Sequence, residues 1–237
     1  MKSIAIFRHN RTEGAGYFSE YLDQQAVPWQ VIKLDEGTDV PQDSREFSGL
    51  AFMGGPMSVN DPLPWIPPVL ALIQHAVSHG VPVIGHCLGG QLLCRALGGR
   101  VVPNPVPEIG WHAVESIPGV ASQAWLGSDT VTFDAFHWHN ETFSIPPGAT
   151  QLLIGRNCVN QAYVLGPHIG MQCHVEMTPD MILTWCRDWH QEGHQATATV
   201  QTPEHMCSSM DQRLAAMRLF TDRIYGRWLE GVSARAA

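Results

Sequence analysis

Positive charge is scarce in this sequence of 237 residues, and long apolar runs are absent. There are 14 Lys and Arg against 22 Asp and Glu, a formal net charge of −8, and the basic residues form no cluster along the chain. Nucleic-acid binding depends on neutralising phosphates with Lys and Arg, so this balance argues against a nucleic-acid partner. No stretch approaches the roughly 20 apolar residues that a membrane helix needs, so we expect no membrane segment.

The sequence also shows no secretory signal and no boundary between domains. The first seven residues are too short and too mixed for a secretory signal and are interpreted as a buried strand. The six cysteines form no C-x-x-C pair and are irregularly spaced, so a disulfide framework is not expected. No repeat, low-complexity tract or linker divides the chain. We therefore expect a cytoplasmic protein in which residues 1–237 form a single domain, with 193–237 as a C-terminal helical extension.

Short apolar runs alternate with amphipathic stretches in the first half of the chain. The expected strands and helices, in chain order, are 3–7, 16–26, 29–34, 49–53, 67–79, 81–84 and 88–97, of which 16–26, 67–79 and 88–97 are the helices. Such alternation implies right-handed crossovers and a parallel sheet with helices on both faces. The predicted fold class is α/β, with three α/β/α layers around a central, mostly parallel sheet.

The remainder of the chain has a different character. Short strands that extend the sheet or add an antiparallel layer are expected at 112–117, 130–136, 151–154, 161–165 and 169–173. Helices are expected again at 179–192 and 203–228. The last helix carries an apolar row for which packing against the sheet and a homodimer interface both remain open, formed by Leu214, Met217, Leu219, Phe220, Ile224, Trp228 and Leu229.

The strongest local signal is the run Gly-His-Cys-Leu-Gly-Gly-Gln at residues 85–91. A buried strand is expected to end there and a helix to begin after Cys87, with glycines on either side that permit a sharp turn. This is the pattern of a nucleophile elbow, which presents a cysteine at the carboxyl end of a sheet. The helix start and a nearby imidazole favour a reactive thiolate. A lone cysteine is more often a small buried hydrophobe, as we expect for Cys94.

Two further segments supply the groups that a cysteine nucleophile needs. The run Gly-Gly-Pro-Met-Ser at 54–58 follows the third strand, and its backbone N–H groups can donate to an oxyanion, although such runs also mark ordinary turns. The run Gln-Cys-His-Val-Glu at 172–176 places His174 and Glu176 two residues apart after a buried strand. A base and the carboxylate that orients it are expected in such a pair.

Taken together, the segments 85–91, 54–58 and 172–176 resemble the class I, triad-type glutamine amidotransferase domain. The resemblance covers roughly residues 1 to 190 and is closest to stand-alone members related to the glutaminase half of GMP synthase. It implies a flavodoxin-like fold and a catalytic triad of Cys87, His174 and Glu176. The implied reaction is hydrolysis of the glutamine side-chain amide through a γ-glutamyl thioester, which releases glutamate and ammonia.

The resemblance also implies where the substrate lies. The amides of Gly55 and Leu88 would form the oxyanion hole. The residues implied at the substrate itself are Gly54, Gln91, Trp138 and His139. Trp138 and His139 belong to a segment, 136–141, whose backbone receives the α-carboxylate and amine of glutamine in the family. The segment 108–111 is similar to one that lines the family's cleft, and we assign it no chemical role.

The sequence departs from the family pattern at two informative positions. Val175 stands where the family usually has the proline of His-Pro-Glu, which affects how stiffly the two flanking residues are held. Asn140 replaces a frequent glycine and puts a side chain into a segment that approaches glutamine closely.

Three functions remain open. The first is hydrolysis of glutamine. Because the sequence up to Ala237 shows no Gly-rich phosphate loop of an ATP-pyrophosphatase domain, the ammonia would pass to a separate synthetase subunit, or the protein would act as a free-standing hydrolase. A γ-glutamyl peptidase or transferase using the same thioester is the second possibility. The third is a regulatory subunit that gains activity only with a partner. All three involve a small-molecule substrate and no cofactor.

Histidine pairs provide the remaining candidates for a metal site, which we do not expect. His190 and His194 lie four residues apart, but Gly193 is expected to end their helix and the H-E-x-x-H arrangement is absent. His137 and His139 alternate on a strand and should share a face, where cleft lining or packing is favoured over metal binding.

Overall fold

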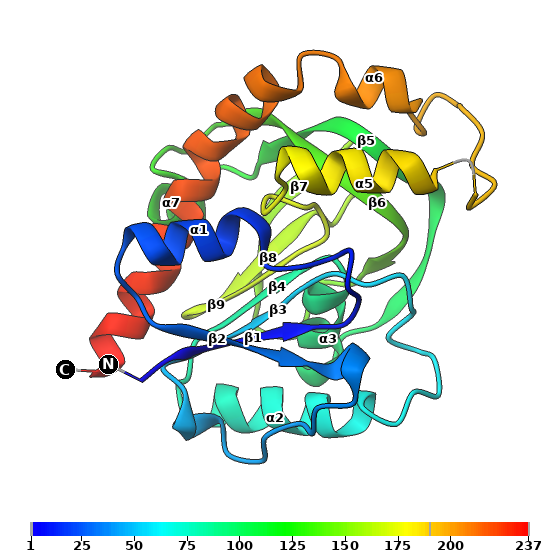
Figure 1. Cartoon of the computed structure of the whole chain (residues 1–237). Coiled ribbons are helices and arrows are strands. Elements are labelled where there is room, and N and C mark those ends of the chain that lie inside the picture. Colours follow the sequence, from blue (N-terminus) through cyan, green and yellow to red (C-terminus); the bar gives the residue numbers. More distant parts are fainter. Residues whose placement is uncertain (1, 190, 237) are drawn as a thin grey trace.

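The computed structural model describes all residues except 1, 190 and 237, and its centre is one nine-stranded sheet (Figure 1). The strand order is β2-β1-β3-β4-β9-β8-β7-β5-β6. The strands are β1 (Ile4–Arg8), β2 (Trp29–Lys33), β3 (Gly49–Phe52), β4 (Val83–His86), β5 (Val101–Ser116), β6 (Thr132–Phe143), β7 (Thr150–Gly155), β8 (Ala162–Leu165) and β9 (His168–Met171). The helices are α1 (Gly16–Gln24), α2 (Ile66–Ser78), α3 (Leu88–Ala96), α4 (Val120–Leu126), α5 (Pro179–Asp188), α6 (Pro203–Cys207) and α7 (Met210–Ala236). No helix in the described part of the chain is long and apolar enough to cross a membrane.

The half of the sheet that carries the strand–helix alternation is parallel. β1 pairs in parallel with β2 and β3, β3 with β4, and β4 with β9. Every residue of β3, β4 and β9 is buried. Strands that are covered on both faces have apolar residues on both sides, which explains why they read as continuous apolar runs.

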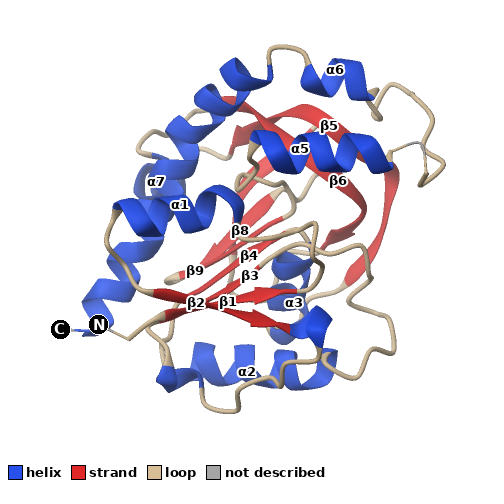
Figure 2. Ribbon diagram, in the orientation of Figure 1, coloured by secondary structure: helices blue, strands red, loops and turns tan. Residues whose placement is uncertain are grey.

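Helices cover both faces of this parallel region, as the α/β prediction requires (Figure 2). α2 and α3 pack on one face, where Leu72 and Leu92 belong to one buried cluster with Phe52 of β3. α1 and α7 pack on the other face, where Phe18 and Trp228 belong to a second cluster with Ile6 of β1. The fold class predicted from the sequence is confirmed.

The middle of the chain extends the same sheet with four antiparallel strands, β8, β7, β5 and β6. The first part of β5 was not predicted because residues 103–107 contain three prolines, which seldom lie within a sheet. The structure accommodates them at a register shift between Pro103 and Glu108, where the side chains are largely exposed. The short helix α4 was also not predicted.

The C-terminal region differs from the single helix expected at 203–228. It forms two helices, α6 and α7, that are separated at Ser208 and Ser209, and Ser209 has a positive φ of 54° that a helix interior excludes. The expected helix 179–192 ends at Asp188. In α7, Trp228 is fully buried, whereas Leu219 is 66% exposed, so most of the apolar row packs inward.

Candidate active site

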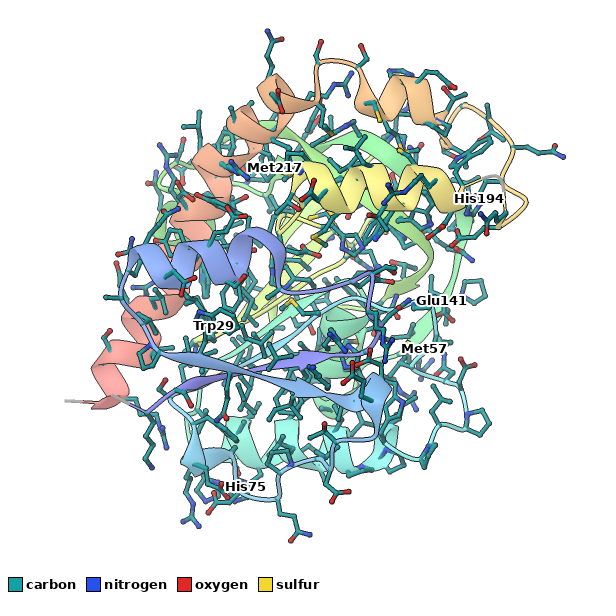
Figure 3. All side chains as sticks on the ribbon, viewed as in Figure 1. Trp29, Met57, His75, Glu141, His194 and Met217 are labelled. Atoms are coloured by element: carbon teal, nitrogen blue, oxygen red, sulfur yellow. The ribbon has the colours of Figure 1, made fainter. Side chains whose placement is uncertain are left out.

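The candidate site lies at the edge of the sheet where the parallel strands end. The loops after β1, β3, β4 and β9 meet there, as parallel strands require. A cavity of about 790 Å³ opens at this edge, and Cys87 lies in its wall. Met57, Glu141 and His194 also line the cavity, and Figure 3 shows all three beyond the same edge of the sheet.

Cys87 occupies the sharp turn that its flanking glycines predict. It has φ 49° and ψ −107°, between the end of β4 and the first residue of α3. A Cβ atom on Gly85 would collide with the backbone of Gly89, and one on Gly89 would collide with the carbonyl of Phe52. The Cys87 N–H donates to the carbonyl oxygen of Met171 at 2.8 Å, which fixes the turn to β9. A non-glycine residue at positive φ persists only where the surroundings enforce it.

His174 and Glu176 follow β9 and form a buried pair. The Nδ1–H of His174 donates to Oε1 of Glu176 at 2.6 Å, and both side chains are about 1% exposed. The backbone N–H of His174 donates to the carbonyl of Phe136 at 2.8 Å, and the indole of Trp185 packs edge-on against the imidazole. This leaves Nε2 of His174 available to the Cys87 sulfur, which is near enough to raise the pKa of the imidazole. The structure thus brings together the three side chains of the predicted triad.

Electrostatics within this group favour a charged imidazole. Burial lowers the pKa of His174, but the neighbouring Glu176 carboxylate and Cys87 sulfur more than offset it and hold the pKa well above its usual value. Burial raises the pKa of Glu176, and the positive charge of His174 brings it below its usual value. Both shifts favour the form of the pair in which the imidazole is protonated and the carboxyl group is ionised.

The two predicted oxyanion donors are neighbours. A Cβ on Gly55 would lie 2.8 Å from a methyl carbon of Leu88. Leu88 is the first residue of α3, so its N–H has no acceptor within the helix. In the described part of the chain, neither the Gly55 nor the Leu88 N–H hydrogen-bonds to another protein group.

The predicted substrate residues occupy different positions. Gln91, Trp138 and His139 line the cavity, and so does Asn140. Gly54 does not line it but lies behind it, where a Cβ would meet the carboxyl group of Glu13 and would lie 2.9 Å from Cε1 of His174.

A chain of amides links one of these residues to the sulfur. Nε2 of Gln91 donates to Oε1 of Gln172 at 3.2 Å, and Nε2 of Gln172 donates to Sγ of Cys87 at 3.5 Å. On the other side, the carbonyl oxygen of Trp138 lies 4.0 Å from Sγ. Gln172 belongs to the run at 172–176, but nothing in the sequence alone marks it as a contact of the sulfur.

Glu108 is a functional candidate that the sequence analysis left without a role. Its buried Oε2 accepts from Nε2 of His139 at 3.0 Å and from Nε2 of Gln161 at 2.7 Å. Nδ1 of His139 lies 2.9 Å from the carbonyl oxygen of Glu141. Because the carboxylate of Glu108 and the carbonyl of Glu141 are both acceptors, the two contacts are both hydrogen bonds only when each ring nitrogen carries a proton. Burial raises the pKa of Glu108, but the hydrogen bond from His139 more than offsets this, and the pKa falls to about 2. Glu108 therefore anchors the segment that carries His139.

Glu13 was missed entirely, because nothing in its local sequence distinguishes it. It lies in the loop between β1 and α1 and lines the cavity. The pKa of Glu13 is raised to about 7, mainly by burial. The positive charge of His174 opposes this shift, and the negative charge of Glu176 adds to it.

One group of described residues offers metal-ligating atoms close together. These atoms, from Glu108, His137 and His139, all lie within 4.8 Å of one another, and His137 and His139 share a face as predicted. Burial lowers the pKa of His137 to about 3, so its ring is neutral and able to coordinate. The carboxylate oxygen nearest both histidines already accepts two hydrogen bonds, which favours a packing network. His190 of the other pair lies outside the described residues.

Comparison with known proteins agrees with the fold and the resemblance noted in the sequence. The family model for class I glutamine amidotransferases matches residues 18–182. The chain belongs to the class I glutamine amidotransferase family.

Individual relatives and solved structures support this assignment. A glutamine amidotransferase from Methylobacillus flagellatus is 43% identical with a TM-score of 0.94, covering 98% of this chain and 95% of that one. The glutamine amidotransferase-like protein YfeJ of Salmonella typhimurium is 28% identical over 180 residues, which cover 73% of this chain and 75% of the relative. A subunit of the glutamine-hydrolysing GMP synthase of Sulfolobus acidocaldarius is 30% identical over 164 residues, covering 67% and 79% respectively.

Proposed function

We propose that the protein hydrolyses the side-chain amide of glutamine, or of a γ-glutamyl compound like it, with Cys87 as the nucleophile. The observation that carries the proposal is the position of Cys87, on a strained turn at the cavity wall and beside the buried, hydrogen-bonded His174–Glu176 pair. Membership of the class I glutamine amidotransferase family supports the same reaction class.

The proposed reaction has two halves. Sγ of Cys87 attacks the amide carbon, and the N–H groups of Gly55 and Leu88 stabilise the oxyanion that forms. His174 gives its Nε2 proton to the leaving nitrogen, the C–N bond breaks, and the γ-glutamyl group remains on sulfur as a thioester. His174 then takes a proton from water, whose oxygen attacks the thioester, and Cys87 leaves as thiolate. Glu176 holds the imidazole in place and stabilises its charged form throughout.

The substrate would lie between the elbow helix and the hairpin of β5 and β6. Gln91 lies one turn into α3, and Trp138 and His139 of β6 line the same cavity. Gly54 shapes the loop that carries the Gly55 amide. Because Glu108 fixes His139, we assign the 136–141 segment to the α-carboxylate and amine of the glutamyl group.

A γ-glutamyl peptidase or transferase is the second candidate, and the size of the cavity favours it. Glutamine has ten non-hydrogen atoms, whereas a cavity of about 790 Å³ is of the size that encloses drug-sized ligands. A larger γ-glutamyl compound therefore fits the space better than free glutamine.

Transfer of ammonia to a separate synthetase is the third candidate. Two relatives are named as subunits of glutamine-hydrolysing GMP synthases.

We further propose that residues 1–237 work as one cytoplasmic domain with 193–237 as a C-terminal extension. The packing of Trp228 of α7 directly against Gly49 of β3 supports the single domain.

The test is an assay of ammonia or amine release from glutamine and from γ-glutamyl amides, with acid quenching and mass spectrometry to trap the thioester. The expected label of one γ-glutamyl group lies on Cys87, and Cys87→Ala abolishes both label and turnover. Cys207→Ala is the matched control, because Cys207 is partly exposed and lies outside the cavity. A label on another cysteine would contradict the assignment.

A further inference from the structure

Acidic side chains outnumber basic ones in the wall of the cavity. Five acidic side chains line it, and no Lys or Arg does so among the residues described. They are Glu13, Asp61, Glu141, Asp188 and Glu192. Free glutamine carries one positive and one negative charge, so a wall in which these acids outnumber the two histidines, His139 and His194, offers no net attraction to it.

Three of the five carboxylates have structural partners. Asp61 accepts the backbone N–H of Ser58, and Glu141 accepts the Ser58 hydroxyl, both at 2.9 Å. Glu192 pairs with His194 at 2.8 Å. In the described structure, the side chains of Glu13 and Asp188 accept no hydrogen bond and form no salt bridge, although both line the cavity; the charge of His174 acts on Glu13 from across Gly54. Two carboxylates inside the proposed substrate site are therefore unpartnered, in the sense that no hydrogen-bond donor among the described residues contacts them.

These unpartnered carboxylates lie on the His174 side of the cavity. Glu13 and His174 meet at Gly54, where a Cβ would touch both side chains. Trp185 packs edge-on against the His174 ring, and Asp188 lies three residues further along α5, on the same face of that helix. The general acid must lie beside the amine that it protonates, so this is the side from which the leaving amine departs.

We infer that the preferred substrate is a γ-glutamyl amide whose amine portion carries a second, positively charged group, with Glu13 and Asp188 as the residues that recognise that charge. The inference rests on the proposed hydrolase function and specifies its substrate class. The volume beyond the glutamyl group accommodates such an amine, and the unpartnered carboxylates supply its counter-charge. The negative charge on Glu13 also increases when a cation binds, because a nearby positive charge lowers the pKa that burial has raised to about 7.

The test compares two amides of equal length that differ in one charge. The γ-glutamyl amide of 1,4-diaminobutane ends in an ammonium group, and the γ-glutamyl amide of butylamine ends in a methyl group. We expect kcat/KM for the charged amide to exceed that for the neutral one roughly 5- to 30-fold at low salt, with the ratio falling as salt is added. Asp188→Asn and Glu13→Gln should each reduce this ratio. Asp134→Asn, an exposed acid outside the cavity, is the matched control and should leave the ratio unchanged.

The outcomes separate this inference from the function on which it rests. Equal kcat/KM for the two amides, with normal acylation of Cys87, overturns the charge inference and leaves the hydrolase proposal standing. A preference that survives in both variants overturns the assignment to Glu13 and Asp188. No turnover of either amide or of glutamine, and no acylation of Cys87, overturns the hydrolase function and the inference with it. Thermal unfolding of each variant confirms that a changed ratio does not come from a damaged fold.

Discussion

Replacing Glu176 with Gln is the sharpest test of the proposed charge pair. The substitution keeps the shape of the side chain and an oxygen that can accept from Nδ1 of His174, but it removes the negative charge. His174 is about 1% exposed and would retain burial, which lowers its pKa, without its main counter-ion. The variant therefore isolates charge from geometry.

The expected cost is large because both groups are buried. Removing one partner of a buried ion pair typically destabilises a protein by about 3–5 kcal/mol. The pKa of His174 is raised on folding. Its contribution to the free energy of unfolding is therefore complete below the pKa of the unfolded state and is lost as pH rises through the pKa of the folded state. The pKa of Glu176 is lowered on folding. Its contribution to the free energy of unfolding is therefore present above the pKa of the unfolded state and is lost as pH falls through the pKa of the folded state. The difference between wild type and variant should therefore be greatest around neutral pH and shrink toward both extremes.

The assay is chemical denaturation of both proteins across pH, together with kcat/KM for a γ-glutamyl amide. We expect turnover to fall about 10²- to 10⁴-fold, the range that a positioned acid–base group supplies. Glu230→Gln is the matched control: its pair with Arg227 is exposed, and such a pair contributes at most about 1 kcal/mol. A stability difference that does not vary with pH, or an equal effect in the control, would refute the reasoning.

Three further predictions concern single contacts. Gly89→Ala should destabilise the protein by about 1–3 kcal/mol and abolish thioester formation, because its methyl group would collide with the Phe52 carbonyl; denaturant midpoints and the trapping assay measure this. Glu108→Gln should raise KM at least about tenfold with a smaller change in kcat, because it weakens a charge-assisted bond that positions His139; steady-state kinetics separate the two constants. KM for the ammonium-bearing amide should fall as pH rises through about 7, where Glu13 ionises, and this pH dependence should disappear in Glu13→Gln.

For each of these three predictions, one result would contradict it. Normal acylation of a folded Gly89→Ala protein would show that the elbow tolerates a side chain. A loss in kcat alone for Glu108→Gln would place that residue in chemistry and not in binding. An identical pH dependence of KM for the butylamide would trace the titration to a group that the two substrates share.

The parallel half of the fold was predictable because its signals are local. The strands around Ile6 and Ile84 are short apolar runs, and the helices between them show a clear 3.6-residue period, so element type and order follow directly. The antiparallel half was less predictable. The prolines at 103 and 105 hide the start of β5, and its pairing with β6 is visible only once the chain has folded back.

The same distinction separates the site residues that the sequence revealed from those that it did not. Cys87 is recognisable because the glycines that its turn requires lie two residues away on either side, and His174 and Glu176 because they lie two residues apart after a buried strand. Glu13 and Glu108 have no such local marker. Glu13 acquires significance only because its loop reaches His174, 161 residues away, and Glu108 only because β5 pairs with β6 and brings it against His139.

Different parts of this chain are therefore proposed to determine the reaction and the choice of substrate. The groups proposed to break the amide bond sit at the ends of buried parallel strands, whose positions are fixed by the core. The groups proposed to recognise the leaving amine sit on the loop after β1 and at the end of α5, which that core constrains less. Substitutions in these loops can alter the charge facing the amine without disturbing Cys87, His174 and Glu176. It follows that relatives sharing the elbow need not share a substrate, and that the charge lining the His174 side of the cavity predicts the substrate class better than the triad does.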